Sequence, residues 1–361
     1  MTTSDPPRRV KVWRIVGSLA VAAVLLIGIL PQLADLGEVW ATIRGLAPGW
    51  VAALLLASAW NIATYQFVMM SALPGLSMGR AFVAGQLSTA LANTVPAGAV
   101  VGVGVTYTVL RSFGHGTRAI AIAAAVTGVF NTFVKLGLPI VALAWLALGG
   151  EASTALAATA VTGLAVLVAA LVVGGLSLSR ASIARGTGEW TGAVVSRVRR
   201  LFKRGPVSDW GERFADFQSR SAEVLRDRWA LVTGSTLISH LSLYVVLLVA
   251  LRAVGIDPGE VSAAQAMGAF AFVRLATALP ITPGGLGVVE LGMSAALTVA
   301  GGPEAQVVAA VLIYRTLTYA LQVPLGALSW VVWRRHARRR PVQAQGGQAQ
   351  GGPAQGGPAQ G

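Results

Sequence analysis

The sequence predicts an all-α polytopic membrane protein with six full transmembrane helices and two re-entrant hairpins in an inverted repeat. The first observation is composition: 55% of the 361 residues are hydrophobic and only 12% are charged, whereas soluble domains usually carry about 25% charged residues. The second is that the charges gather in a few segments between long uncharged runs. The third is the distribution of Lys and Arg, which sets the number of membrane crossings.

Eight apolar segments are long enough to cross a bilayer, since a transmembrane helix needs about 20 largely apolar residues. They are 15–34, 50–70, 81–110, 119–148, 152–178, 230–251, 262–301 and 305–332. The first follows a basic N-terminus, residues 1–14, and has no small-residue cleavage pattern, so we predict a retained anchor. Residues 15–333 are therefore predicted to form one transmembrane domain.

Basic residues mark the cytoplasmic side of a membrane protein. Segment 180–228 holds 11 Lys/Arg against 6 acidic residues, and segment 334–340 is basic without acids. Both should be cytoplasmic, but if every apolar segment crossed once, 180–228 would face outward. The conflict disappears if 81–110 enters and leaves from the cytoplasm, turning at 93–98, while 262–301 does so from outside, turning at 280–285. The alternative is that these Pro/Gly clusters only kink ordinary spans.

The two predicted hairpins also suggest an internal repeat. Aligning Pro96 with Pro283 sets 90–98 against 277–285, and each hairpin follows one full span and precedes another. Because the hairpins enter from opposite faces, the pattern is typical of the inverted repeats of secondary transporters. Non-helical backbone at that depth must be buried or line a wet cavity, so a central cavity is predicted. The alternative is chance similarity within a chain rich in small residues.

Four ionisable residues are predicted to lie inside the membrane: Lys135, Arg274, Glu290 and Arg315. Such groups usually face a cavity or each other. From their depths we expect Arg274, Glu290 and Arg315 to form one cluster with net positive charge, suited to a phosphate or carboxylate head group. The alternative is a structural ion pair that holds the hairpin against its neighbour.

The two turns supply further candidate substrate-binding positions, because half-helix N-terminal amides can donate to a ligand there. They are Asn93, Pro96, Gly98, Pro280, Pro283, Gly284, Gly285 and Gly287. Gly98 and Gly102 form a small-residue motif, for which helix packing is the favoured interpretation. His240 is expected to be buried and hydrogen-bonded to a neighbouring helix.

Motifs of soluble enzymes are not found in the sequence. It has no cysteine, no phosphate-binding loop, no His-Glu-x-x-His zinc pattern and no paired carboxylates, so neither enzymatic activity nor a metal or cofactor is predicted. The basic residues flank apolar spans instead of forming a nucleic-acid-binding domain. The expected partners are membrane lipids, with the amphipathic loop 180–228 resting on the anionic leaflet. Residues 334–361 form a basic, low-complexity tail predicted to be disordered and cytoplasmic.

Two motifs carry a resemblance to a known family. Leu279-Pro-Ile-Thr-Pro-Gly-Gly-Leu-Gly-Val-Val-Glu290, followed by Arg315-Thr-Leu-Thr, resembles the signature of the flippase-like transmembrane family, and Asn93-Thr-Val-Pro96-Ala-Gly98 is similar to its first-repeat motif. That family is the membrane portion of lysylphosphatidylglycerol synthases and also occurs as stand-alone proteins. Many members carry an acid and an Arg after the first turn, but residues 99–107 have neither.

The resemblance covers about residues 15–333 and implies translocation or presentation of a polar-headed phospho- or glycolipid in the cell membrane. Synthase activity belongs to an additional soluble domain in that family, and only 28 residues follow the predicted transmembrane domain 15–333 here. Synthase catalysis is therefore not expected. Two alternatives are a transporter of a small anionic or amphipathic solute, and a non-transporting scaffold for a lipid-modifying enzyme.

Overall fold

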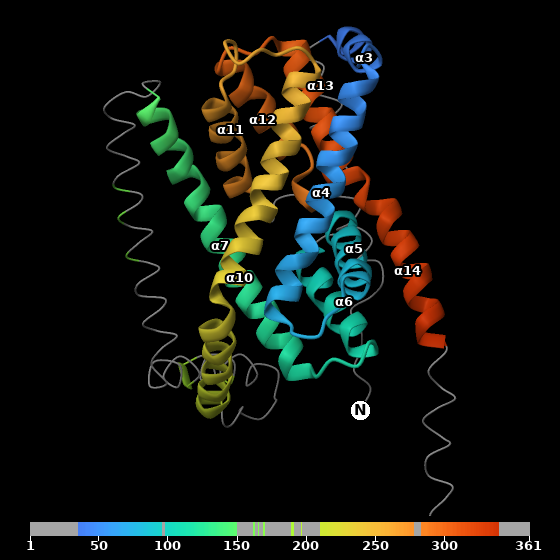
Figure 1. Cartoon of the computed structure of the whole chain (residues 1–361), viewed down its shortest axis with the longest axis vertical. Coiled ribbons are helices and arrows are strands. Elements are labelled where there is room, and N and C mark those ends of the chain that lie inside the picture. The colour runs from blue at the N-terminus through green and yellow to red at the C-terminus, as the bar shows by residue number, and fades with distance from the viewer. Residues whose placement is uncertain are drawn as a thin grey trace, which may run out of the picture.

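The computed structural model describes residues 35–95, 98–149, 210–277 and 283–338, together with a few isolated positions between 162 and 196. Every regular element in these residues is helical (Figure 1). The predicted spans 15–34 and 152–178, most of the loop 180–228 and the tail beyond 338 lie outside the described residues.

Four helical stretches within the described residues are long and apolar enough to cross a membrane. They are helix α4 (Pro48–Ala72), helix α7 (Thr117–Leu148), the part of helix α10 (Trp210–Ala253) from Leu225 to Ala253, and Glu304–Ala337. The last stretch comprises α13 (Glu304–Arg315), the π-helical turn η3 (Thr316–Ala320) and α14 (Gln322–Arg338). Each coincides with one predicted span, so the multi-pass class of the protein is confirmed.

The two segments predicted as hairpins each contain a pair of shorter helices. Helices α5 (Met78–Thr94) and α6 (Gly98–Ser112) pack against each other, as do α11 (Ala263–Ala276) and α12 (Val288–Val299). The first pair breaks at the predicted Pro-Gly turn. The second pair is separated by the 3₁₀ turn η2 (Pro283–Gly285). Figure 1 shows α11 and α12 in the upper half of the molecule and α5 and α6 in the lower half.

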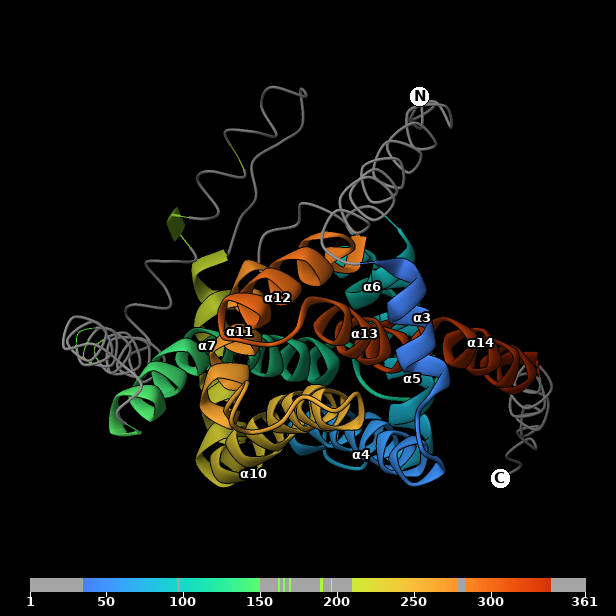
Figure 2. The same cartoon turned by 90° about the horizontal axis from the view of Figure 1, so that it is seen from above.

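Small side chains allow the helices to approach closely at two contacts. Helices α4 and α10 lie side by side along one face (Figure 2), where Asn61 donates from Nδ2 to Ser242 Oγ at 2.8 Å. Helix α14 packs on α5 at Gly326, where a Cβ atom would lie 2.2 Å from the Cβ atom of Ala90. A larger residue at position 326 would therefore separate these helices.

Large apolar side chains face outward from the long helices. Leu56 of α4, Val141 of α7 and Leu328 of α14 are 71%, 57% and 64% exposed. Apolar surface of this extent is unfavourable in water and favourable against lipid tails. The inner faces instead enclose a core that includes Phe270 and Met293, both fully buried.

Charged residues separate between the two ends of the bundle. The end with the α4–α5 and α6–α7 turns carries Arg80, Arg111, Arg118 and Arg228, with the acidic residues Asp216, which pairs with Arg118, and Asp227, and we call it the basic end. The opposite end, the acidic end, carries Asp35, Glu38, Asp257, Glu260 and Glu304, with the basic residues Arg44 and Arg252. The segments predicted to be cytoplasmic and those predicted to be external are thus at opposite ends.

A short helix, α3 (Leu36–Arg44), lies at the acidic end and was not predicted from the sequence. Its N-terminus is capped by Asp35, whose Oδ1 accepts hydrogen bonds from the backbone N–H groups of Gly37 and Glu38 at 2.6 and 3.4 Å. The helix packs against α13. A cap of this type satisfies N–H groups that have no partner within the helix.

Candidate functional site

A cavity of about 200 Å³ lies between α4, α10 and the α13–η3–α14 stretch, and α5, the end of α11 and the η2 turn also line it. Two of its lining residues are basic, Arg274 and Arg315, and none is acidic. Most of the others carry neutral polar groups. The amide and aliphatic hydroxyl side chains that line it include Asn61, Gln86, Thr89, Asn93, Thr318 and Gln322.

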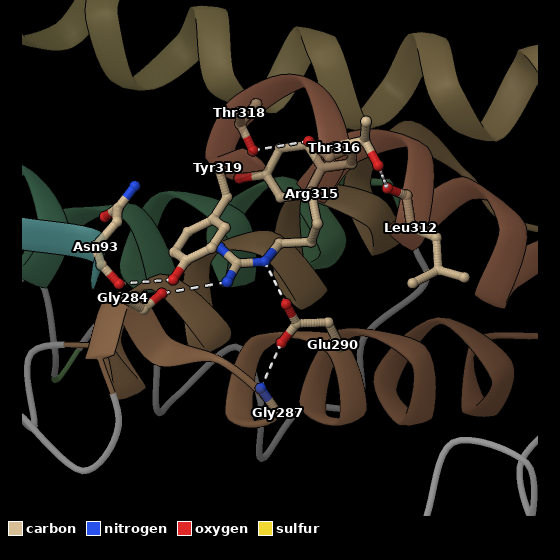
Figure 3. A network of polar contacts seen from close by, with 10 residues as sticks. Asn93, Gly284, Gly287, Glu290, Leu312, Arg315, Thr316, Thr318 and Tyr319 are labelled. Carbon is tan, nitrogen blue, oxygen red and sulfur yellow. Dashed lines mark hydrogen bonds and ion pairs between the residues drawn. The ribbon is translucent and has the colours of Figure 1, made fainter. Parts of the chain in front are cut away.

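Glu290 is held by two partners at the start of α12. Its Oε2 accepts a hydrogen bond from the backbone N–H of Gly287 at 2.7 Å, and its Oε1 accepts from Arg315 Nε at 2.5 Å (Figure 3). The side chains of Glu290 and Arg315 are only 4% and 12% exposed. This is a buried, charge-assisted pair, and such pairs are stronger than hydrogen bonds between neutral groups. The predicted pairing of Glu290 with Arg315 is therefore present.

Arg315 also contacts two groups on the other side of its guanidinium. Nη2 donates to the Gly284 carbonyl at 3.2 Å, and the guanidinium carbon lies 4.2 Å from the centre of the Tyr319 ring. The Tyr319 hydroxyl in turn donates to the Asn93 carbonyl at 2.7 Å (Figure 3). A continuous set of contacts thus links the turn before α12 with the C-terminal end of α5.

Glycine is required in the turn before α12. Gly284, Gly285 and Gly287 have φ angles of 60°, 72° and 79°, a region that side chains rarely adopt. At Gly284 a Cβ atom would also lie 2.2 Å from the Tyr319 ring. The Gly residues of the predicted motif therefore allow the backbone to approach Tyr319 and present its carbonyl to Arg315.

Arg274 departs from the predicted three-residue cluster. It lies in the last turn of α11 and lines the same cavity as Arg315, but it makes no ion pair with Glu290. Its Nε atom is buried and has no hydrogen-bond partner. The expectation of one cluster is therefore right for Glu290 and Arg315, while Arg274 shares only the cavity.

Two further ionisable groups lie close enough to Arg274 to interact with it electrostatically. Lys135 is on α7, and His240 is on α10. Pro139 has no N–H, so the α7 backbone cannot make the usual helical bond to the Lys135 carbonyl. His240 is buried, but its Nδ1 bonds to the Thr236 carbonyl of its own helix at 3.0 Å. The prediction of a bond to a neighbouring helix was therefore wrong.

The remaining predicted positions shape the backbone or lie outside the described residues. A Cβ on Gly98 would lie 1.9 Å from the Ala92 carbonyl oxygen, which supports the packing interpretation of this glycine. Pro283 begins the η2 turn. Pro96 and Pro280 lie outside the described residues. Among the turn candidates that the structure describes, Asn93 and Gly284 line the cavity.

The π-helical turn was not predicted, although one proline signals it. Pro324 cannot donate to the carbonyl of residue 320, and its ring crowds that carbonyl. The helix responds with an i→i+5 bond from Leu321 N to the Thr316 carbonyl at 2.9 Å. The freed Leu317 carbonyl accepts from Ser58 Oγ at 3.3 Å. This widened turn places Thr318 and Tyr319 at the cavity, and π-turns are frequent at functional sites.

A second, smaller cavity of about 70 Å³ lies between α4, α5, α6 and α7. It shares Tyr65 with the larger cavity and is lined by neutral polar groups such as Gln66, Ser88 and Thr127. Polar side chains therefore continue from the central cavity towards the basic end.

Comparison with known proteins gives one family match. The model of the family described as the lysylphosphatidylglycerol synthase TM region matches residues 15–326. No curated protein sequence matches the chain. Within the part of the chain that the structure describes, no group of three or more His, Cys, Asp or Glu residues is arranged to hold a metal ion.

Proposed function

Since the chain belongs to the family of the lysylphosphatidylglycerol synthase TM region, we propose that it binds the head group of a polar lipid in its central cavity. We further propose that it moves this lipid across the cytoplasmic membrane or presents it at one leaflet. No catalytic role is part of the proposal.

The observation that carries the proposal is the polar cavity inside an apolar bundle. Its volume of about 200 Å³ is of the size of a small head group, and its lining combines two arginines with amides and hydroxyls. Burial of polar groups without partners costs free energy, so such a lining is maintained where a polar ligand or water occupies it. The outer surface of α4 and α14 is rich in exposed Leu, Val and Trp, which suits contact with acyl chains.

An inverted repeat with two re-entrant hairpins is the second part of the proposal, and the helix boundaries support it. When the residue offset that aligns Pro96 with Pro283 is added to the bounds of α6, the result is 285–299, which contains α12 (Val288–Val299). The same offset carries α7 onto 304–335, which α13, η3 and α14 cover. In transporters of this design the substrate binds between the two repeats near the bilayer midplane.

Six full spans, with the basic end facing the cytoplasm, complete the proposed topology. The separation of basic and acidic residues supports this orientation, since Lys and Arg favour the cytoplasmic side. The N- and C-termini would both be cytoplasmic, and the basic loop 180–228 would rest on anionic lipid.

A leaflet-resolved assay tests the function. The purified full chain is reconstituted in liposomes with fluorescent lipids that differ only in head group, and outer-leaflet fluorescence is quenched with an impermeant reductant. We expect protein-dependent movement that varies with the head group. Uptake of soluble anions without lipid movement would favour a solute transporter instead. Neither activity, at normal incorporation, would favour a scaffold.

A further inference from the structure

The two arginines of the cavity differ in how fully their donors are used. Arg315 donates to Glu290 and Gly284 and stacks on Tyr319. Among the described residues Arg274 makes no ion pair, and its buried Nε finds no hydrogen-bond partner there. A buried donor without a partner costs free energy, because it has lost its hydrogen bonds to water. A ligand with acceptor oxygens would remove that cost at Arg274, whereas at Arg315 it would have to displace existing contacts.

The charges around Arg274 favour an anion and disfavour a cation. Lys135 is its electrostatic neighbour, and no acidic residue lines the cavity within the part of the chain that the structure describes. Glu290 is the nearby acid, but its two oxygens accept from Arg315 and Gly287. An ammonium group in the cavity would therefore be repelled by Arg274 and Lys135 and would find no carboxylate among the described lining residues.

A second unused group faces the same cavity from the opposite pair of short helices. Gln86 of α5 lines the cavity and is 1% exposed, and its buried Oε1 has no hydrogen-bond partner in the part of the chain that the structure describes. An amide oxygen accepts hydrogen bonds, so it is suited to a hydroxyl group of the ligand. Arg274 supplies a positive donor and Gln86 a neutral acceptor, and a phosphate ester of a polyol has both matching groups.

From these contacts we propose that the cavity takes a phosphate ester of an uncharged polyol or sugar, with Arg274 bound to the phosphate and Gln86 accepting from a hydroxyl. Head groups that carry an ammonium group, whether an amine or an aminoacyl ester, are disfavoured by the positive charge of Arg274 and Lys135. Arg315 then acts as a positioning residue, because its bonds to Glu290 and to the Gly284 carbonyl hold the turn before α12 in place. This inference rests on the proposed function, since it identifies the head group that the same cavity accepts.

The first experiment compares fluorescent lipids in liposomes containing the full chain. We expect phosphatidylglycerol and phosphatidylinositol to move at least 10-fold faster than phosphatidylethanolamine and lysyl-phosphatidylglycerol. Arg274→Gln should reduce movement of the anionic lipids at least 10-fold and Arg274→Lys less. The control Arg44→Gln, which removes an exposed arginine of α3, should leave movement unchanged. Equal movement of the amine-bearing lipids, or full activity of Arg274→Gln, would overturn the inference.

The second experiment isolates the role of Gln86. Phosphatidylmethanol has the charge of phosphatidylglycerol but no free hydroxyl group on the head group. Wild-type protein should prefer phosphatidylglycerol, and Gln86→Leu should lower that preference at least threefold while movement of phosphatidylmethanol persists. If the preference survives in Gln86→Leu, the assignment of the hydroxyl site is wrong.

A binding measurement separates this inference from the proposed translocation. The melting temperature of detergent-solubilised protein is measured with short-chain phosphatidylglycerol, with short-chain phosphatidylethanolamine, and with glycerol phosphate alone. If no lipid moves in liposomes but short-chain phosphatidylglycerol still stabilises wild type and not Arg274→Gln, translocation fails and the head-group assignment stands. Stabilisation by glycerol phosphate alone would indicate a soluble ligand of the same chemistry. No stabilisation by either phosphate ester, or equal stabilisation by phosphatidylethanolamine, would overturn the assignment.

Discussion

Replacing Glu290 with Gln should destabilise the protein, because it leaves Arg315 charged and without its carboxylate. The two side chains are 4% and 12% exposed, so solvent screens this pair little. Removing one partner of a buried pair typically costs about 3–5 kcal/mol. Arg315 would keep its bond to the Gly284 carbonyl and its stacking on Tyr319. We therefore expect a loss near the lower limit, about 3 kcal/mol.

The loss can be measured by thermal unfolding in detergent. Proteins of 150–250 residues lose about 2–4 °C per kcal/mol, and this chain is longer, so a decrease of about 6 °C is expected. Glu304→Gln is the matched control, because Glu304 is exposed in the first turn of α13 and should contribute less than about 1 kcal/mol.

A double-variant cycle separates the pair from other effects of the substitution. If the ion pair provides the stability, Glu290→Gln together with Arg315→Gln should cost clearly less than the sum of the two single changes. A melting temperature for Glu290→Gln within 2 °C of that of Glu304→Gln would refute the reasoning. So would strict additivity of the two changes in the double variant.

Two further predictions concern the turn and the topology. Gly284→Ala should lower the free energy of unfolding by about 2 kcal/mol or more and abolish lipid movement, because its Cβ would lie 2.2 Å from the Tyr319 ring at a φ of 60°. The control Gly49→Ala, with open space around the new Cβ, should change the melting temperature little. Equal stability of the two variants would contradict the account. In this cysteine-free chain, Gly116→Cys should react with an impermeant thiol reagent only from the cytoplasm and Gly259→Cys only from outside, and reaction of Gly116→Cys from outside would refute the proposed topology.

The long spans were predictable because bilayer thickness imposes a simple length requirement on uncharged sequence. The Pro-Gly turn before α12 was also predictable, since Gly284 and Gly287 adopt φ angles that favour glycine. The depth of Glu290 and Arg315 along their helices could be estimated from helical rise alone. That estimate predicted that the two residues lie at similar depth and close together, and the hydrogen bond between them is present in the structure.

The choice between Arg274 and Arg315 could not be made from the sequence. Both were predicted at similar depth, and which of them meets Glu290 depends on the angular position of each side chain about its helix. The Gly287 N–H fixes one carboxylate oxygen, which leaves the other for α13. Tyr319 and Gln86 were missed for a related reason: neutral polar residues are common in membrane helices, and only tertiary structure shows which of them face a cavity.

The buried ion pair and the unpaired arginine have different consequences for binding. Glu290 binds Arg315, which donates to the Gly284 carbonyl and stacks on Tyr319. Tyr319 in turn donates to the Asn93 carbonyl at the end of α5. These contacts fix the cavity wall on both sides before any ligand enters, which lowers the ordering cost of binding. The Nε of Arg274, which has no partner among the described residues, can then donate to the ligand, because Arg315 fills the structural role in this wall.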